Sequence, residues 1–143
     1  MTETSRNWQR LRDANTEVPA KPARAIWTAV LDYLTGPLTL RITATGTWQP
    51  VEGLPACGPD GFAHWVFGRD LLINKKAPLG SLIAKIGGSA AGVDDGVELF
   101  LLGSYAVLTI DKASGPLYLT INDAPSGFDD NVGEVRVIIE QAL

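Results

Sequence analysis

Glycine and proline divide this chain into short segments, and this feature limits its fold more than any other. The 143 residues include 15 glycines and 9 prolines, spread along the whole sequence. Long helices tolerate neither residue, because glycine costs backbone entropy and proline lacks the amide hydrogen that a helix interior needs. The pattern therefore favours a β architecture with many turns, in one domain of ordinary size.

Between these breaks, apolar and polar residues alternate in the way that half-buried strands require. In the clearest run, Leu38, Leu40, Ile42 and Ala44 alternate with threonines and an arginine; such a period of two indicates a strand with one buried face. Similar runs occupy residues 25–33, 81–86, 97–101, 105–110, 117–121 and 134–140. Seven or eight short strands predict an all-β fold, a jelly-roll-type β-sandwich of two antiparallel sheets.

The segments between the strands are predicted as turns and loops. Turns are expected at residues 36–37, 95–96 and 114–116, and the glycine-rich residues 87–92 are expected to form a flexible connection. Residues 46–80 are irregular, and a loop of this length is usually functional or contains short elements of its own. The two tryptophans of this segment, Trp48 and Trp65, could form a stacking platform for a ligand or belong to the core.

The first 22 residues differ from the rest in pattern. They are polar and basic, and they end in a proline-rich stretch, so we divide the chain into an N-terminal arm, 1–22, and a β-sandwich domain, 23–143. Trp8 and Leu11 are spaced as on one turn of a helix. We expect the arm to dock on the domain or on a neighbouring chain.

The charge balance excludes some classes of partner. With 12 basic against 16 acidic residues, the net charge is −4. This charge argues against a protein that binds nucleic acid and against one that binds membranes through a polybasic surface. The first 15 residues lack the apolar segment of a secretory signal, and the most apolar stretch, 97–110, is too short and too interrupted for membrane insertion. We therefore expect a cytoplasmic protein, with unconventional export left open.

Residues suited to catalysis are scarce. Cys57 is the only cysteine and His64 the only histidine, so an intrachain disulfide and a catalytic histidine pair are both excluded. Cys57 lacks the basic neighbours that activate a thiolate and is expected to be structural. No nucleophile motif accompanies His64. These observations predict a protein that is not an enzyme, with a small hydrolase as the weaker alternative.

The densest polar cluster lies between two predicted strands, at residues 122–133. It offers three aspartates and two asparagines together with glycine and proline, the oxygen ligands and tight curvature that suit a hard cation such as Ca²⁺. Its spacing does not match the EF-hand loop. A solvated turn rich in Asp and Asn is the alternative, since these residues dominate turns in general. The residues alone leave both interpretations open.

Three stretches, taken in order, resemble a known family. They are residues 43–48, 80–87 and 114–123, the last running into Asp130-Asn131-Val132-Gly133. Over residues 25–142 the chain resembles the LecA-like family of bacterial galactophilic lectins. The resemblance implies a small jelly-roll-type sandwich that binds galactose through one Ca²⁺.

The resemblance also implies a set of site residues. Asp123, Asp130 and Asn131 would bind Ca²⁺ through their side chains, and Gly127 and Pro50 through their backbone carbonyls. In the family, sugar hydroxyls complete the coordination of the ion, so Asp123, Gly127, Asp130 and Asn131 would also be sugar-binding residues.

Three positions depart from the family pattern or match it loosely. Pro50 stands where the family prototype has a tyrosine, and Asp129 stands where it has a glycine. His64 is the one possible counterpart of the family's sugar-contacting histidine. Metal binding therefore carries over to this sequence better than the sugar preference does.

Together these observations predict a calcium-dependent, lectin-like carbohydrate-binding protein, with galactose or a related sugar as ligand. Because a single shallow sugar site binds weakly, and linked sites bind more tightly, we expect a homo-oligomer, either a dimer or a tetramer. The alternative function is a non-catalytic interaction or assembly module, in which the calcium is structural and no sugar binds.

Overall fold

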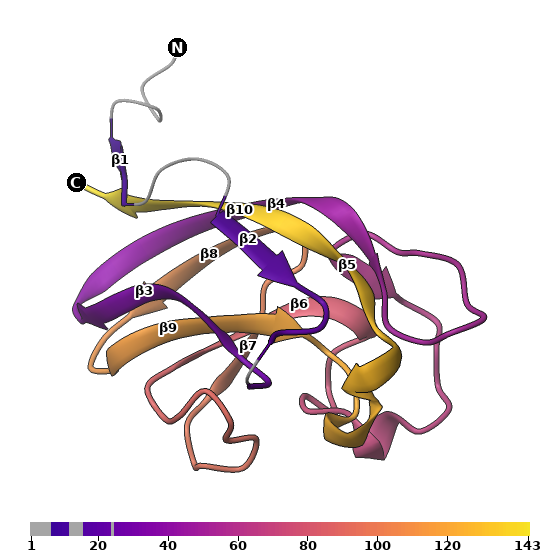
Figure 1. Ribbon diagram of the computed structural model, residues 1–143. Helices are drawn as coiled ribbons and strands as arrows, with labels where there is room; N and C mark the ends of the chain where they lie inside the picture. The colour runs from indigo at the N-terminus through magenta and orange to yellow at the C-terminus, as the bar shows by residue number, and fades with distance from the viewer. Residues whose placement is uncertain (1–6, 12–15, 24) are drawn as a thin grey trace.

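The structure is a computed structural model that describes residues 7–11, 16–23 and 25–143. In this part of the chain, two five-stranded antiparallel sheets pack against each other (Figure 1). The prediction of an all-β sandwich with two antiparallel sheets is confirmed. In the same described residues, no helix is long and apolar enough to cross a membrane.

The first sheet is built around the last strand of the chain. It contains β1 (Trp8–Arg10), β2 (Thr16–Pro19), β4 (Leu38–Gln49), β8 (Tyr105–Ile110) and β10 (Val132–Ala142). β4 pairs with β10 along one side and with β8 along the other. β1 and β2 both pair with β10, β2 with residues 134–137 and β1 with residues 140–142.

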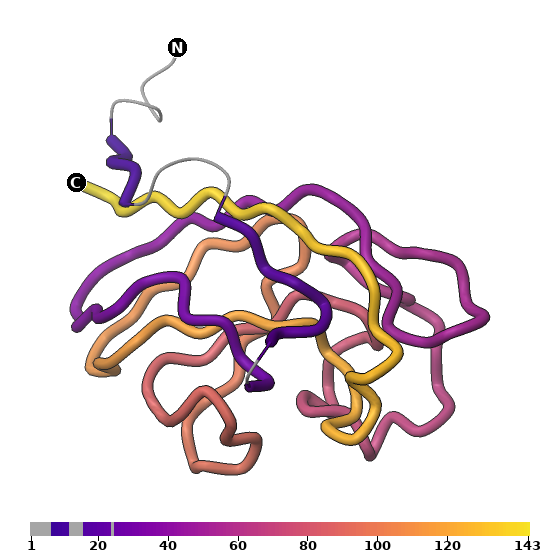
Figure 2. Tube along the Cα trace, in the orientation of Figure 1, coloured from indigo at the N-terminus to yellow at the C-terminus, as the bar shows by residue number. Residues whose placement is uncertain are grey.

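The second sheet has β6 and β9 at its centre. It contains β3 (Thr28–Thr35), β5 (Asp60–Phe62), β6 (Leu79–Ile86), β7 (Leu99–Leu101) and β9 (Ser114–Ile121), in the order β3-β9-β6, with β5 and β7 also pairing with β6. Two short 3₁₀ helices, η1 (Arg69–Leu71) and η2 (Pro125–Asp130), lie in loops. η2 connects β9 to β10 and thereby joins the two sheets, as the chain trace in Figure 2 shows.

The core lies between the sheets and follows the alternation seen in the sequence. Inward-facing residues of β4, β9 and β10 are fully or almost fully buried, among them Leu40, Leu119 and Ile139. β6 differs, since all eight of its residues are buried. A strand that is covered on both faces shows a continuous buried run instead of alternation, and here this run includes a charged residue, Lys85.

The described residues of the predicted arm belong to the first sheet. Trp8–Arg10 is a strand and not a turn of helix, because its backbone pairs with the end of β10. The Trp8 ring lies 4.5 Å from the Arg41 guanidinium, and Leu11 packs against the core. Val18 and Ala20 are completely buried. The boundary at residue 22 stays a prediction.

One predicted turn is wrong. Residues 114–116 are the start of β9, although they contain a glycine and a proline. Gly115 adopts a φ of 129°, and a Cβ at this position would lie 2.8 Å from the Gly87 Cα. The Gly87 amide donates to the Pro116 carbonyl at 2.9 Å. Gly115 is therefore needed because two chain segments pass close to each other here, and it does not form a turn.

Candidate cation and ligand site

The polar cluster of the sequence forms the connection from β9 to β10, at one end of the sandwich (Figure 1). We call residues 122–131 the η2 loop. Its 3₁₀ helix begins with Pro125, whose missing amide hydrogen costs nothing at a helix start. The Gly127 amide donates to the Ala124 carbonyl at 2.8 Å. The buried Phe128 ring holds the helix against the core. The loop is thus an ordered element of the fold.

Asn122 has a structural role in this loop. Its side-chain amide donates to the carbonyls of Asn74, Ala77 and Pro78, each at 3.0 Å. Its side-chain oxygen accepts the Asn74 amide at 2.9 Å. A fully buried carboxamide whose donors and acceptor are all used has nothing left for a ligand. Asn122 therefore ties the segment before β6 to the end of β9.

Asp123 and Asn131 form the unusual part of the loop. Both residues are only 4% exposed. Asp123 Oδ1 accepts the Ala124 amide at 2.7 Å, and the Asn131 Nδ2 donates to the Ala20 carbonyl at 2.8 Å. Among the described residues, however, Asp123 Oδ2 and Asn131 Oδ1 are buried without any hydrogen-bond partner. A buried polar atom without a partner costs about 1–3 kcal/mol, so two neighbouring cases in one loop require an explanation.

The electrostatics of Asp123 agree with this picture. Burial raises the pKa of its carboxyl group to about 6, because a charged carboxylate is poorly solvated there. The Ala124 amide and the neighbouring Asn131 side chain oppose the shift, and the negative charge of Asp130 adds to it. The described residues around Asp123 thus supply too little positive charge or hydrogen bonding to offset the burial of this carboxylate.

Two further predicted ligands lie beside this pair. A Cβ placed on Gly127 would lie 3.2 Å from Asp123 Oδ1, so the backbone of η2 passes directly over the carboxylate. Asp130 is exposed, and its Oδ2 accepts the Glu52 amide at 3.1 Å. The structure therefore brings Asp123, Gly127, Asp130 and Asn131 together.

The two remaining predicted residues are less closely tied to the loop. Pro50 is buried near Gly80, two residues before Glu52, so the turn after β4 reaches Asp130. His64 is exposed in the turn after β5, and in the described part of the chain it makes no hydrogen bond with the η2 loop. The ligand role of Pro50 and the sugar contact of His64 stay predictions.

The donor set decides which kind of cation these residues fit. In the described residues, no three His, Cys, Asp or Glu side chains gather into a metal site. Zn²⁺ prefers histidine nitrogen and cysteine sulfur ligands. Burial raises the pKa of Cys57 to about 11, which keeps its thiol protonated and unsuited to Zn²⁺. Ca²⁺ accepts a mixture of carboxylate, carboxamide and backbone oxygens. Two aspartates, an asparagine and the nearby backbone fit Ca²⁺.

The two loop tryptophans lie in different surroundings. Trp48 is 1% exposed, and its indole nitrogen donates to the Gly80 carbonyl at 2.7 Å, so it is a core residue and cannot stack on a ligand. Trp65 instead packs among Phe62 and Phe67, with ring centroids 6.5 and 5.9 Å away. Of this cluster, Phe67 is 76% exposed.

A hollow of about 730 Å³ lies next to the η2 loop. It is lined by residues 70–76 and 93–99 and by Pro125 of η2. One wall is attached to the loop directly, because the Ile73 amide donates to the Asp123 carbonyl at 3.1 Å. The predicted ligands of the η2 loop do not line this hollow, which adjoins the loop at Pro125.

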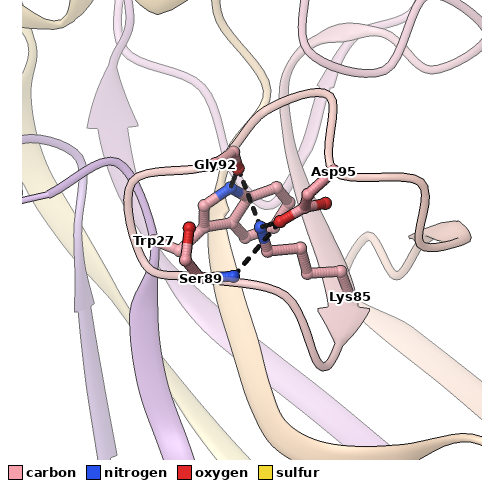
Figure 3. A network of polar contacts seen from close by, with 5 residues as sticks. All are labelled: Trp27, Lys85, Ser89, Gly92 and Asp95. Atoms are coloured by element: carbon pink, nitrogen blue, oxygen red, sulfur yellow. Dashed lines mark hydrogen bonds and ion pairs between the residues drawn. The ribbon is translucent and has the colours of Figure 1, made fainter.

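A second buried polar cluster was not predicted from the sequence (Figure 3). Lys85 Nζ is fully buried and donates to the Gly92 carbonyl at 2.7 Å and to Asp95 Oδ2 at 2.8 Å. It lies 4.7 Å from the Trp27 ring, whose nitrogen donates to the same Gly92 carbonyl. The Ser89 amide also donates to Asp95. The one available signal was a lysine within the apolar run 81–86.

Comparison with known proteins gives one informative result. No protein-family model and no curated protein matches the sequence. Among solved structures, the chain is similar to one described as "EclA N-terminal domain; PllA-like lectin", with a TM-score of 0.65 and 20% sequence identity. The alignment covers 95% of this chain and 98% of the other. At this identity the similarity establishes the fold: the chain adopts the β-sandwich architecture of that lectin domain.

Proposed function

We propose that this protein binds carbohydrate through a Ca²⁺ ion held by the η2 loop. The observation that carries the proposal is the pair of buried oxygens, Asp123 Oδ2 and Asn131 Oδ1, that have no hydrogen-bond partner among the described residues. Both are acceptors, so a cation satisfies them together, whereas a water molecule satisfies them only by donating both of its hydrogens. Gly127 and Asp130 would supply further oxygens.

The sugar part of the proposal has two supports. Ca²⁺ takes six to eight oxygen ligands, and four loop residues plus the turn at Pro50 leave positions for two hydroxyl groups of a sugar. The similar solved structure is a lectin domain by its description. The resemblance to galactophilic lectins makes galactose or a related sugar the first ligand to test. On this proposal the protein turns over no substrate.

The alternative is an interaction or assembly module with a structural Ca²⁺ and no sugar ligand. The same buried oxygens support it equally well, because a structural ion would satisfy them too. Calorimetry separates the two functions: Ca²⁺ is titrated first, and methyl galactoside is then titrated with and without a chelator. Sugar binding that requires Ca²⁺ supports the lectin function. If Ca²⁺ binds but neither galactoside nor any glycan on an array does, the structural module is favoured.

A matched pair of variants tests which carboxylate holds the ion. Asp123→Asn replaces a buried carboxylate ligand by a neutral amide, which binds Ca²⁺ less strongly, and we expect Ca²⁺ affinity to fall at least a hundredfold. Asp129→Asn removes the same charge from the same loop, but Asp129 is exposed, and Lys21 donates to its backbone carbonyl and not to its side chain. We expect this control to change affinity less than threefold. Equal losses in both variants would mean that only the loop's net charge matters, and failure of the wild type to bind Ca²⁺ would refute the proposal.

We also propose that the protein forms a dimer or a tetramer. Joining several weak sugar sites in one particle raises the apparent affinity for a multivalent glycan without new contacts. Trp8 and Leu11, which the sequence assigned to an arm docking on the domain or on a neighbouring chain, contact Arg41 and the core of their own chain. Both are only half-buried, so the proposed interface could still include them. Sedimentation of the protein at micromolar concentration tests the proposal, and a monomer would contradict it.

A further inference from the structure

The side chain of Asn131 is oriented by a residue far away in the sequence. Its Nδ2 donates to the Ala20 carbonyl at 2.8 Å, in a buried position. Only the NH₂ end of a carboxamide can face a carbonyl oxygen, since the other end is itself an acceptor. The Ala20 carbonyl therefore fixes which way the amide points, and it leaves Asn131 Oδ1 free toward the proposed cation.

Ala20 holds this position because β2 is docked on β10. β2 pairs with residues 134–137 of β10, and the Ala20 amide continues the ladder by donating to the Gly133 carbonyl at 2.9 Å. Val18 and Ala20 are both completely buried. The next residue, Lys21, donates from Nζ to the Asp129 carbonyl at 3.1 Å. The segment 16–21 thus contacts the η2 loop at two points.

β1 provides an internal comparison. It also pairs with β10, but with residues 140–142, at the opposite end of the strand from Asn131 (Figure 1). After it, the Leu11 amide donates to the Ile139 carbonyl at 2.9 Å. β1 and β2 are therefore short strands of the same sheet and share a partner, but among the described residues it is those after β2 that contact the η2 loop.

We propose that β2 is a positioning element of the cation site, so that docking of residues 16–21 and binding of a divalent cation strengthen each other. The inference rests on the proposed cation site and adds a second requirement to it. With β2 docked, Asn131 presents its oxygen to the ion. With β2 detached, the amide loses its partner and can rotate, and the site loses a prepared ligand. Because coupling between two binding events is reciprocal, Ca²⁺ must also hold β2 in place.

The first test is hydrogen exchange on the intact wild-type protein, with saturating Ca²⁺ and with chelator. We expect the Ala20 amide to exchange at least tenfold more slowly in Ca²⁺, because the ion favours the docked state. The Leu11 amide, bonded in the same way beside β1, should change less than twofold. Equal slowing at both amides would indicate general stabilisation and overturn the proposal, as would an unchanged rate at Ala20.

The second test compares two loosened strands by calorimetry with Ca²⁺ alone. Val18→Ser weakens the docking of β2 and should lower Ca²⁺ affinity about five- to twentyfold, within the usual range of coupling between sites. Trp8→Ser weakens β1 and should lower it less than twofold. If Val18→Ser fails to fold, the exchange experiment on the wild type still tests whether Ca²⁺ binding and β2 docking are coupled. Ca²⁺ binding that is unaffected by Val18→Ser overturns only this inference, whereas a wild type that binds no Ca²⁺ overturns the proposed function with it.

Discussion

Two clusters of buried polar groups occur in this protein, and they are completed in different ways. Around Lys85, the ammonium group meets a carboxylate and a carbonyl, and the Trp27 and Tyr118 rings lie 4.7 and 5.5 Å from it. Around Asp123 and Asn131, two acceptor oxygens lack a hydrogen-bond donor among the described residues. Both clusters are ordered and close to loops. The first is closed by contacts within the chain, whereas the second has two acceptors that the proposed cation would satisfy.

The same contrast appears in the pKa values of the two aspartates. The hydrogen bond from Lys85 lowers the pKa of Asp95, although partial burial works against this shift. Burial raises the pKa of Asp123 to about 6, and the negative charge of Asp130 adds to this shift. An aspartate that has its partner favours the charged form, and one that lacks it favours the neutral form. A substitution that breaks one cluster should therefore leave the other undisturbed.

The largest effect is expected from Lys85→Met. Removing one partner of a buried ion pair usually costs about 3–5 kcal/mol, and because the Asp95 side chain is 26% exposed and can regain water, we expect about 3–4 kcal/mol. Urea unfolding measures this loss. Ca²⁺ affinity should stay within twofold of the wild type, since Lys85 does not contact the η2 loop. Lys76→Met, at an exposed lysine, is the control. A loss below about 1 kcal/mol would mean that the Lys85 cluster contributes little to the stability of the fold.

The next effect concerns pH in the metal-free protein. An unfolded Asp titrates near pH 3.9, but Asp123 in the folded protein titrates at about 6. Between these values the folded state keeps a proton that the unfolded state has lost, so stability must fall as pH rises. The full loss, reached above pH 6, is about 3 kcal/mol. Asp95, with its lowered pKa, acts in the opposite sense and loses its contribution as pH falls.

Urea unfolding in chelator, from pH 4 to pH 7.5, tests this prediction. The Asp123→Asn variant has no titratable group at position 123. The difference in stability between the wild type and this variant at each pH therefore isolates the effect of Asp123. The variant should be the more stable protein at pH 7.5 without metal, and it should gain nothing from Ca²⁺. A wild type that is already more stable than Asp123→Asn at pH 7.5 in chelator would contradict the proposed unbalanced carboxylate.

These two clusters also show how much of the molecule the sequence predicts. Alternation located most of the strands, because one face of each is buried, and the two-sheet sandwich followed from their number. The polar cluster at 122–133 was visible from the closeness of its residues in the chain, whereas the resemblance to galactophilic lectins singled out Asp123, Asp130 and Asn131 within it. The Lys85 cluster could not be predicted, because Trp27, Lys85 and Asp95 lie on three separate segments that only the packed sheets bring together.

The role of β2 was missing for a similar reason. The contact between Ala20 and Asn131 joins residues 111 positions apart, and it uses a backbone carbonyl that no residue type reveals. For Trp48 the sequence left two interpretations open, a ligand platform or a core residue. Its pairing with Cys57 and its bond to Gly80 place it in the core. Local patterns predict elements, whereas long-range contacts decide what their side chains do.

A smaller effect is expected from Asn131→Asp, which tests the orientation imposed by Ala20. The substitution keeps an oxygen for the cation but places a second acceptor against the Ala20 carbonyl, where the wild type has a donor. Without metal, we expect a loss of about 1–3 kcal/mol in urea unfolding. Ca²⁺ should recover part of this loss, since a carboxylate binds it more strongly than an amide does. Asn131→Asp with unchanged stability in chelator would contradict the proposed role of the amide.

The smallest effect is expected from His64→Ala, and it distinguishes the sugar from the metal. His64 is exposed, so its removal should change stability by less than about 0.5 kcal/mol and leave Ca²⁺ affinity unchanged. If it contacts sugar, as the resemblance to galactophilic lectins implies, one lost hydrogen bond of about 0.5–1.5 kcal/mol should weaken galactoside binding roughly two- to tenfold. Calorimetry in saturating Ca²⁺ measures this change. Lys112→Ala is the control, because Lys112 is exposed in the turn before β9, whereas the η2 loop follows the other end of that strand. Unchanged galactoside affinity in His64→Ala would separate His64 from the ligand while leaving the cation site in place.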